Sequence, residues 1–321
     1  MGKFLLGLSS AVMIILMTIA IFYYQSESVP LGNVVSSTEE TEQPVDEQES
    51  GNEGEDSLPS QTIQPVEPYE EITYSLQDDE LHITFNQGMD WTQVPLEIDQ
   101  LFSGEYSGSR HTLIEDSYVL TENLAAFLYA ERENGSQEQI MLIHSTDQGE
   151  TWEESVVTDQ YSVMRFRKVD FLNDQFGYVI ISVGRTMSQE SSHVFLTHDG
   201  GRSWEETTNS GVTRLIHDGG FVDETTGFLS FGIINPEAPD LHVTQDGGET
   251  WSEAAVNIPE EYKHIFVQAE TPVKEDGHLS VLVNQGPSGD YQGGLIKGKF
   301  ISTDNGMTWE FEKEVDPDES E

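Results

Sequence analysis

The chain of 321 residues is strongly acidic, with 59 Asp and Glu residues against 14 Lys and Arg residues and a formal net charge of −45. Such a charge repels nucleic acid phosphates and anionic lipid head groups, so neither is expected as a partner. Cysteine is absent, which excludes disulfides, thiol nucleophiles, thiolate metal sites and lipid-modified cysteine anchors.

The N-terminal segment from Phe4 to Tyr24 contains no charged residue. As a helix rising ~1.5 Å per residue it spans a ~30 Å hydrocarbon core. Lys3 precedes it and acidic residues follow it, so we expect the rest of the chain on the extracytoplasmic side. Residues 1–24 are therefore predicted to be a transmembrane signal anchor in the cell membrane and the chain's only membrane contact. The alternative is a cleaved secretory signal, for which Thr18 and Ala20 offer a weak site.

The next segment, residues 25–68, is rich in Glu, Ser, Gln and Pro and has no Lys, Arg or aromatic residue up to Pro68. It cannot bury enough apolar surface to offset the entropy of ordering, which predicts an acidic disordered linker. Residues 317–321 form a second acidic segment, the C-terminal tail. The folded domain is therefore expected to cover residues 69–316.

Within that domain, four octets share the pattern [ST]-x-D-x-G-x-[ST]-W. They are STDQGETW from Ser145, THDGGRSW from Thr197, TQDGGETW from Thr244 and STDNGMTW from Ser302. A fifth, TFNQGMDW from Thr84, is degenerate but keeps Gly88 and Trp91. The Asp can accept N–H groups inside a turn and the Gly can adopt positive φ, so each octet predicts a tight hairpin between two strands.

The octets recur at a regular distance, because all five tryptophans close one octet each and lie 47 to 61 residues apart. Apolar runs precede them, and the segments FLNDQFGYVIIS and FVDETTGFLSFG supply two further strands per unit. Four antiparallel strands per repeat predict an all-β fold, a β-propeller of about five four-stranded blades. Only two strands precede Trp91, so the first blade lacks one strand; six blades or imperfect closure are the alternatives.

The octets resemble the BNR, or Asp-box, repeats of sialidases and many secreted propellers. The paired F-x-[DN]-x-x-x-G-[FY] segments are most similar to the propellers of photosystem II assembly and stability factors. The resemblance implies that the octets are structural and lie opposite the binding face. These structural residues are Gly88, Trp91, Asp147, Gly149, Trp152, Asp199, Gly201, Trp204, Asp246, Gly248, Trp251, Asp304, Gly306 and Trp309.

Catalytic chemistry has little support in the sequence. A sialidase would require an arginine triad, a tyrosine nucleophile with a glutamate partner and an R-I-P segment, which is absent. The histidines have no metal-ligand spacing. We therefore expect no catalytic residue, no metal and no cofactor.

One cation precedes the first strand of each long unit, at Arg110, Arg165, Arg214 and Lys263. Equivalent positions converge near the central channel of a propeller, which predicts a cationic ring that binds an anionic ligand. Nearby tyrosines could add stacking surface, and these are Tyr106, Tyr161 and Tyr262. The alternative is that each cation pairs with an acid on its own blade.

These patterns together favour a binding or assembly module for an unknown protein or an anionic glycan or peptide at the central face. The resemblance implies a similar role, since assembly factors use an arginine-bearing face for a protein client. A cell-surface sialidase-type glycoside hydrolase is the alternative function. A passive structural protein of the cell envelope is the third class.

Overall fold

The computed structural model describes residues 63–67, 70–106, 108–131, 138–161 and 164–316, all within the compact unit Ser60–Glu321. The predicted anchor, nearly all of the predicted linker and the C-terminal tail lie outside these ranges. Within the described ranges, no helix has the length and apolar character needed to cross a membrane.

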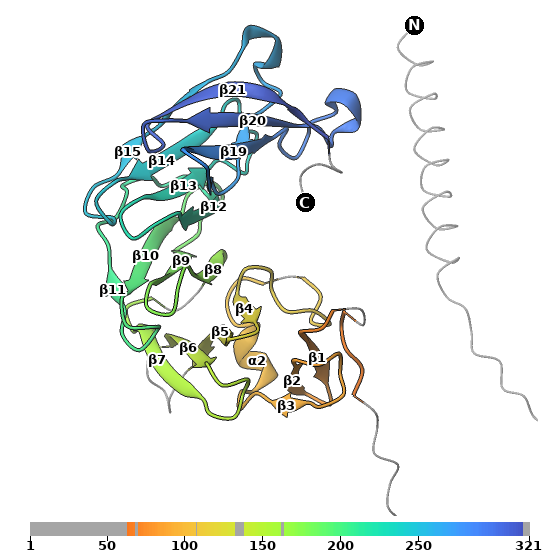
Figure 1. The fold of residues 1–321 in the computed structure, drawn as a ribbon. Coiled ribbons are helices and arrows are strands. Elements are labelled where there is room, and N and C mark those ends of the chain that lie inside the picture. The colour runs from red at the N-terminus through yellow and green to blue at the C-terminus, as the bar shows by residue number, and fades with distance from the viewer. Residues whose placement is uncertain (1–62, 68–69, 107, 132–137, 162–163, 317–321) are drawn as a thin grey trace, which may run out of the picture. The chain divides into compact units, whose positions relative to one another are not determined.

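The described chain is mostly β-structure, and its strands form five sheets that follow one another in chain order (Figure 1). The first sheet contains β1 (Thr73–Gln77), β2 (Glu80–Thr84) and β3 (Thr92–Gln93). The second contains β4 (Tyr118–Thr121), β5 (Leu124–Glu131), β6 (Gln139–Ser145) and β7 (Glu153–Thr158). The third contains β8 (Arg167–Phe171), β9 (Gly177–Val183), β10 (Ser191–Thr197) and β11 (Glu205–Glu206). The fourth contains β12 (Ile216–Phe221), β13 (Gly227–Phe231), β14 (Asp240–Thr244) and β15 (Ser252–Glu253).

The fifth sheet is larger. It contains β16 (Ala255–Asn257), β17 (Gln268–Ala269), β18 (Val273–Glu275), β19 (His278–Asn284), β20 (Lys297–Ser302) and β21 (Thr308–Val315). Strand β16 runs parallel to β21 at the outer edge. Three short helices complete the described structure: α2 (Ile98–Leu101), η1 (Glu260–Tyr262) and η2 (Tyr291–Gly293). The all-β prediction is confirmed, and the succession of four-stranded antiparallel sheets is consistent with a β-propeller. The first sheet has three strands, one short of four as predicted, whereas the last sheet has six where four were predicted.

The hydrophobic core is divided among the spaces between consecutive sheets. Each of four buried clusters contains side chains from two neighbouring sheets. The middle sheets are thus covered on both faces, and β9 and β13 are buried along almost their whole length. This explains why their sequences are continuous apolar runs and do not alternate between apolar and polar residues.

The Asp-box turns are closed by their own side chains. The Asp147 carboxylate accepts hydrogen bonds from the Thr151 backbone N–H and hydroxyl, at 2.8 and 2.6 Å. The Ser145 hydroxyl donates to Asp147 and accepts the backbone N–H of Gly149, both at 2.8 Å. The arrangement recurs in the octets that end at Trp204, Trp251 and Trp309.

The degenerate first turn keeps this geometry although two of its polar side chains are of different types. Asn86 Oδ1 accepts the backbone N–H of Asp90 at 2.9 Å, and Asn86 Nδ2 donates to the Asp90 carboxylate at 3.0 Å. The amide takes the role of the carboxylate, and the carboxylate replaces the hydroxyl. The turn therefore tolerates both substitutions that made the octet look degenerate.

Stability should fall in acid because these turns hold ionised carboxylates. Hydrogen bonds from the Ser203 hydroxyl and backbone N–H are the main cause that lowers the pKa of Asp199 to about 2. A pKa lower in the folded than in the unfolded chain stabilises the fold above about pH 4, and the contribution is lost as the pH falls towards 2. We expect the urea midpoint to drop between pH 5 and pH 3, and Asp199→Asn to reduce that drop. An equal drop in the variant would contradict the assignment.

Each later Asp-box glycine lies against the preceding sheet. A Cβ atom at Gly149, which has φ of +83°, would stand 2.8 Å from Thr92 of the first sheet. At Gly306 it would stand 2.3 Å from Phe228 of the fourth sheet. At Gly88, in the first sheet, the nearest atoms all belong to Trp91 of the same turn. The first turn therefore has no sheet packed before it among the described residues.

The two end sheets carry polar residues where internal sheets carry apolar ones. By strand register, Ser280 of β19 is equivalent to the buried Tyr178 and Phe228, which pack against the following sheet. Ser75 of β1 is equivalent to Phe127, which packs against the preceding sheet. Within the described residues, no apolar cluster joins the fifth sheet to the first. Ser75 and Ser280 are 1% and 3% exposed, so they replace large apolar side chains without lying in solvent.

The missing first strand of the first sheet is partly replaced by the chain before it. The Val66 backbone N–H donates to the Tyr74 carbonyl at 2.9 Å, and the Gln64 backbone N–H donates to Gln77 Oε1 at 3.1 Å. This segment thus covers the free edge of β1 without forming a strand.

Candidate functional site

The ends of the sheets form two faces of different construction. The Asp-box turns join the third and fourth strands of each meander, so the other end holds the segments that enter each sheet and the loops between the second and third strands. We call this opposite end the loop face. Its described residues fall within 78–79, 96–117, 159–166, 184–190, 209–215, 232–239, 258–267 and 285–296.

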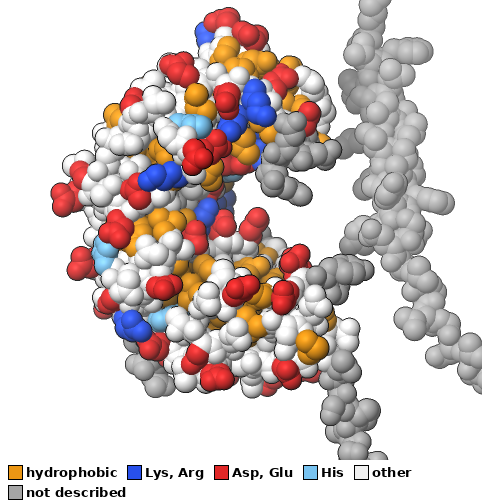
Figure 2. Space-filling view, in the orientation of Figure 1, with side chains coloured by type: hydrophobic (Ala, Val, Ile, Leu, Met, Phe, Trp, Pro, Cys, Tyr) orange, Lys and Arg blue, Asp and Glu red, His pale blue; other side chains and the backbone are white. Residues whose placement is uncertain are grey.

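All four predicted ring cations lie on the loop face, and each contacts a different carboxylate. Arg110 lies 2.5 Å from Asp99, and the partners of Arg214 and Lys263 are Asp240 and Glu260 respectively. These three cations are more than half exposed. Figure 2 shows Asp and Glu side chains spread over the viewed face, with far fewer Lys and Arg side chains among them. The described contacts bring no two of the four cations onto one shared partner, and the ring remains a prediction.

Arg165 differs because its partner is buried. Its guanidinium donates two hydrogen bonds to the Glu190 carboxylate, at 2.7 and 2.6 Å, and the Glu190 side chain is 0% exposed. Arg165 also donates to the Ile216 carbonyl, and Glu190 accepts the Ile216 backbone N–H at 2.8 Å. The pair therefore ties the third sheet to the first strand of the fourth.

The three predicted tyrosines lie in separate local clusters. The Tyr106 hydroxyl donates to the Ser109 carbonyl at 2.8 Å. The Tyr161 ring lies 4.0 Å from the His193 ring, and Tyr262 lies among the aromatic rings of the fifth sheet. Among the described residues these three tyrosines do not contact one another, so each acts locally.

Lys168, which was not among the predicted site residues, contacts residues of several sheets. Lys168 Nζ lies 2.7 Å from Asp218 of β12, 3.7 Å from Asp116 before β4 and 3.4 Å from the Thr271 hydroxyl of the fifth sheet. Burial raises the pKa of Asp116. Burial also opposes ionisation of Asp218, but the Lys168 ammonium and several hydrogen bonds lower its pKa. Lys168 lies within β8, whereas the predicted ring cations precede the first strands. The sequence signal for it was a lysine inside a first strand, two residues before Asp170.

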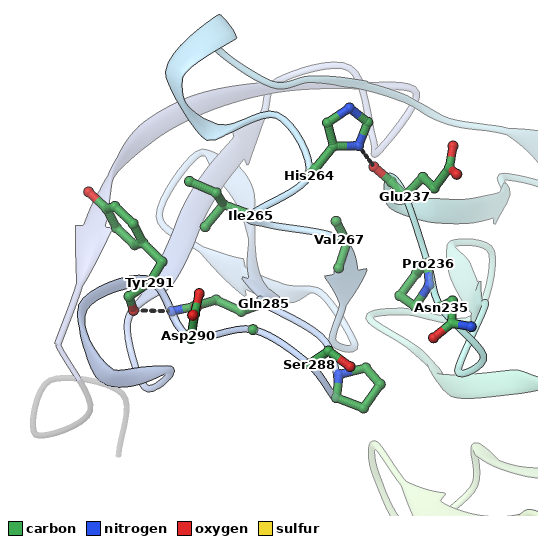
Figure 3. A pocket seen from close by; sticks show the side chains of 12 residues that line it. Asn235, Pro236, Glu237, His264, Ile265, Val267, Gln285, Ser288, Asp290 and Tyr291 are labelled. Atoms are coloured by element: carbon green, nitrogen blue, oxygen red, sulfur yellow. Dashed lines mark hydrogen bonds between the residues drawn. The ribbon is translucent and has the colours of Figure 1, made fainter. Parts of the chain in front are cut away.

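A pocket of about 340 Å³ opens on the loop face between the fourth and fifth sheets (Figure 3). Its wall includes Asn235 and Glu237 from one loop, His264 from the entering segment, and Asp290 and Tyr291 from another loop. His264 Nδ1 lies 3.1 Å from the Glu237 carbonyl, which joins two of these segments. Two proline rings, of Pro236 and Pro287, supply apolar surface.

The buried side-chain amide of Gln285 forms part of the pocket wall. Gln285 Nε2 donates to the carbonyls of Tyr291 and Ile296, both at 2.9 Å, while its Oε1 is buried without a hydrogen-bond partner. The lining contains two carboxylates and no Lys or Arg. The pocket therefore offers hydrogen-bond acceptors and apolar surface, and it disfavours a negatively charged ligand. The pocket was not predictable from the sequence because its walls come from three separate loops.

The comparisons with known proteins agree with the repeat assignment. The model of the BNR/Asp-box repeat matches residues 143–154 and 300–311, which contain two of the octets. These two segments match the BNR/Asp-box repeat, and the recognition of this repeat from the octets is confirmed. A search of curated protein sequences finds no match.

Several solved structures resemble this chain at low identity. A protein of unknown function from Dyadobacter fermentans is 16% identical, with 62% of this chain and 66% of that chain covered and a TM-score of 0.39. A sialidase from Trypanosoma rangeli is 12% identical over 65% and 40% of the chains, with a TM-score of 0.36. A GH74 xyloglucanase from Xanthomonas campestris is 16% identical over 75% and 36%, with a TM-score of 0.39. In each case the match spans less than two thirds of the other protein's length.

Proposed function

We propose that this chain is an exported, membrane-anchored β-propeller that acts as a binding module, and that the loop-face pocket holds an uncharged glycan. The uncharged segment from Phe4 to Tyr24 supports the anchor. Sugar hydroxyls can donate to the carboxylate of Asp290 and exchange hydrogen bonds with Asn235. The proline rings can contact the apolar C–H surface of a sugar ring. The observation that carries the proposal is this set of acceptors on an open pocket opposite the Asp-box turns.

The contacts that the arginines make favour a binding function over sialidase catalysis. Recognition of a sialic acid carboxylate would need several arginines free to converge on it. Among the described arginines, five contact carboxylates, and these are Arg110, Arg165, Arg185, Arg202 and Arg214. Arg167 donates to the carbonyls of Leu101 and Ser103. The carboxylates of the pocket would in addition repel an anionic sugar, which favours an uncharged glycan over the anionic ligand that the sequence suggested.

A glycan array with the full chain tests the proposal. We expect binding to uncharged oligosaccharides and weaker binding to their sialylated counterparts. Asp290→Ala should weaken binding about 10- to 100-fold, because a hydrogen bond to a charged acceptor contributes about 1.5–3 kcal/mol. Glu249→Ala is the matched control, since Glu249 is an exposed acid on an Asp-box turn of the opposite face.

Three outcomes would redirect the assignment. Equal weakening by Asp290→Ala and Glu249→Ala would remove the pocket from the proposal. Turnover of a fluorogenic sialoside would establish the glycoside hydrolase alternative. Capture of a protein client without any glycan would support the assembly role suggested by the repeat pattern.

A further inference from the structure

A serine, a histidine and a glutamate lie in a hydrogen-bonded row on the third sheet. The Ser191 hydroxyl lies 2.9 Å from His193 Nε2, and His193 Nδ1 lies 2.7 Å from Glu206 Oε1. Glu206 is an acceptor, so His193 Nδ1 carries the proton and donates it. His193 Nε2 is then the acceptor for the Ser191 hydroxyl. This is the tautomer that a histidine needs to act as a base towards a serine.

The strand geometry explains why the three groups meet. Ser191 and His193 are two residues apart on β10, so both point to the same face of the sheet. Glu206 pairs with Phe195, the next residue of that face, across the β10–β11 ladder. Tyr161 covers the row, with its ring 4.0 Å from that of His193 and its hydroxyl donating to Glu206 Oε1 at 3.1 Å. Tyr161 therefore positions both the imidazole and the carboxylate.

The exposure of the row increases towards the serine. His193 is 9% exposed, whereas Ser191 is half-buried and reachable from solvent. The Asn209 side-chain amide lies 3.3 Å from the Ser191 hydroxyl oxygen and donates to the Ser192 carbonyl at 2.9 Å. One N–H of this amide is held by the Ser192 carbonyl, so the N–H that donates to Ser191 Oγ is the one that would turn to an oxyanion developing on the attacked carbonyl.

We propose that Ser191, His193 and Glu206 form a hydrolytic triad that cleaves short-chain carboxylic esters, with Asn209 as the oxyanion donor. This activity is independent of the proposed glycan pocket and goes beyond a binding role. A single amide donor supplies only part of the stabilisation that amide cleavage requires, so the substrate class is an ester with a better leaving group.

The reaction balances with water as the co-reactant. Ser191 Oγ attacks the ester carbonyl carbon while its proton passes to His193 Nε2. The bond from the acyl carbon to the alcohol oxygen breaks, and the alcohol leaves with the proton from His193. Water then attacks the acyl-serine, gives one proton to His193, and releases the carboxylic acid as the proton returns to Ser191. No electron transfer occurs.

The test uses the full chain with 4-methylumbelliferyl acetate and with a fluorophosphonate probe. We expect ester turnover above the buffer rate and one fluorophosphonate adduct, located on Ser191 by peptide mass spectrometry. Ser191→Ala should abolish both signals. His193→Gln and Glu206→Gln should each reduce turnover by about 100-fold or more, the range of general base catalysis.

Ser192→Ala is the matched control, because Ser192 is the next residue on the opposite face and its hydroxyl is buried without a partner. We expect it to keep both labelling and turnover. An unlabelled wild-type Ser191, or turnover unchanged in Ser191→Ala, would overturn the proposal. The adduct position is read on the unaltered chain, so the test does not depend on the folding of any variant.

Discussion

Arg165→Gln should lower the free energy of unfolding by about 3–5 kcal/mol, the usual cost of removing one partner from a buried ion pair. The substitution leaves the Glu190 carboxylate, with 0% of its side chain exposed, facing an uncharged amide. Glu190 also accepts the Ile216 backbone N–H, so its displacement would disturb the first strand of the fourth sheet. Urea denaturation at neutral pH, followed by tryptophan fluorescence, measures the change.

Arg110→Gln is the matched control, because Arg110 and its partner Asp99 are 58% and 87% exposed. An exposed pair contributes about 0–1 kcal/mol, so this variant should unfold at nearly the wild-type urea concentration. If both variants lost the same small amount of free energy of unfolding, the Arg165–Glu190 pair would not be what ties the third sheet to the fourth. If neither lost stability but both lost ligand capture, the cationic-ring hypothesis would gain support.

The repeat architecture was predictable because its signals are local. An Asp-box hairpin needs only the octet itself, since the hydrogen bonds of Asp147 all lie within four residues. The apolar runs likewise predicted strands. Closure of the ring of sheets could not be predicted in this way. It depends on whether Ser280 and Ser75 face another sheet, and the pattern of a single strand does not contain that information.

The candidate sites were less predictable because they depend on contacts distant in sequence. Arg165 and Glu190 are 25 residues apart, and Lys168 and Thr271 are 103 residues apart. Counting cations before each first strand identified Arg165 but not its partner. Ser191 and His193 were visible as neighbours on one strand, yet only the β10–β11 register places Glu206 beside them.

The arrangement of the sheets also determines which tryptophans matter most. Trp309 closes the last octet and is 0% exposed between the fourth and fifth sheets. Its ring meets that of Phe228 edge-on at 5.9 Å, and its indole N–H donates to the Gly306 carbonyl at 2.9 Å. Trp91 closes the first octet, where no earlier sheet is packed against the turn among the described residues.

Trp309→Ala should therefore lower the free energy of unfolding by about 3–5 kcal/mol, since it removes a fully buried aromatic side chain and leaves a cavity. Trp91→Ala should lower the free energy of unfolding by about 1 kcal/mol or less, because the Trp91 ring is half-buried and no earlier sheet packs against it among the described residues. Parallel urea titrations followed by circular dichroism compare the two variants. Equal large losses would mean that another part of the chain packs against the first sheet, as it would in a closed ring.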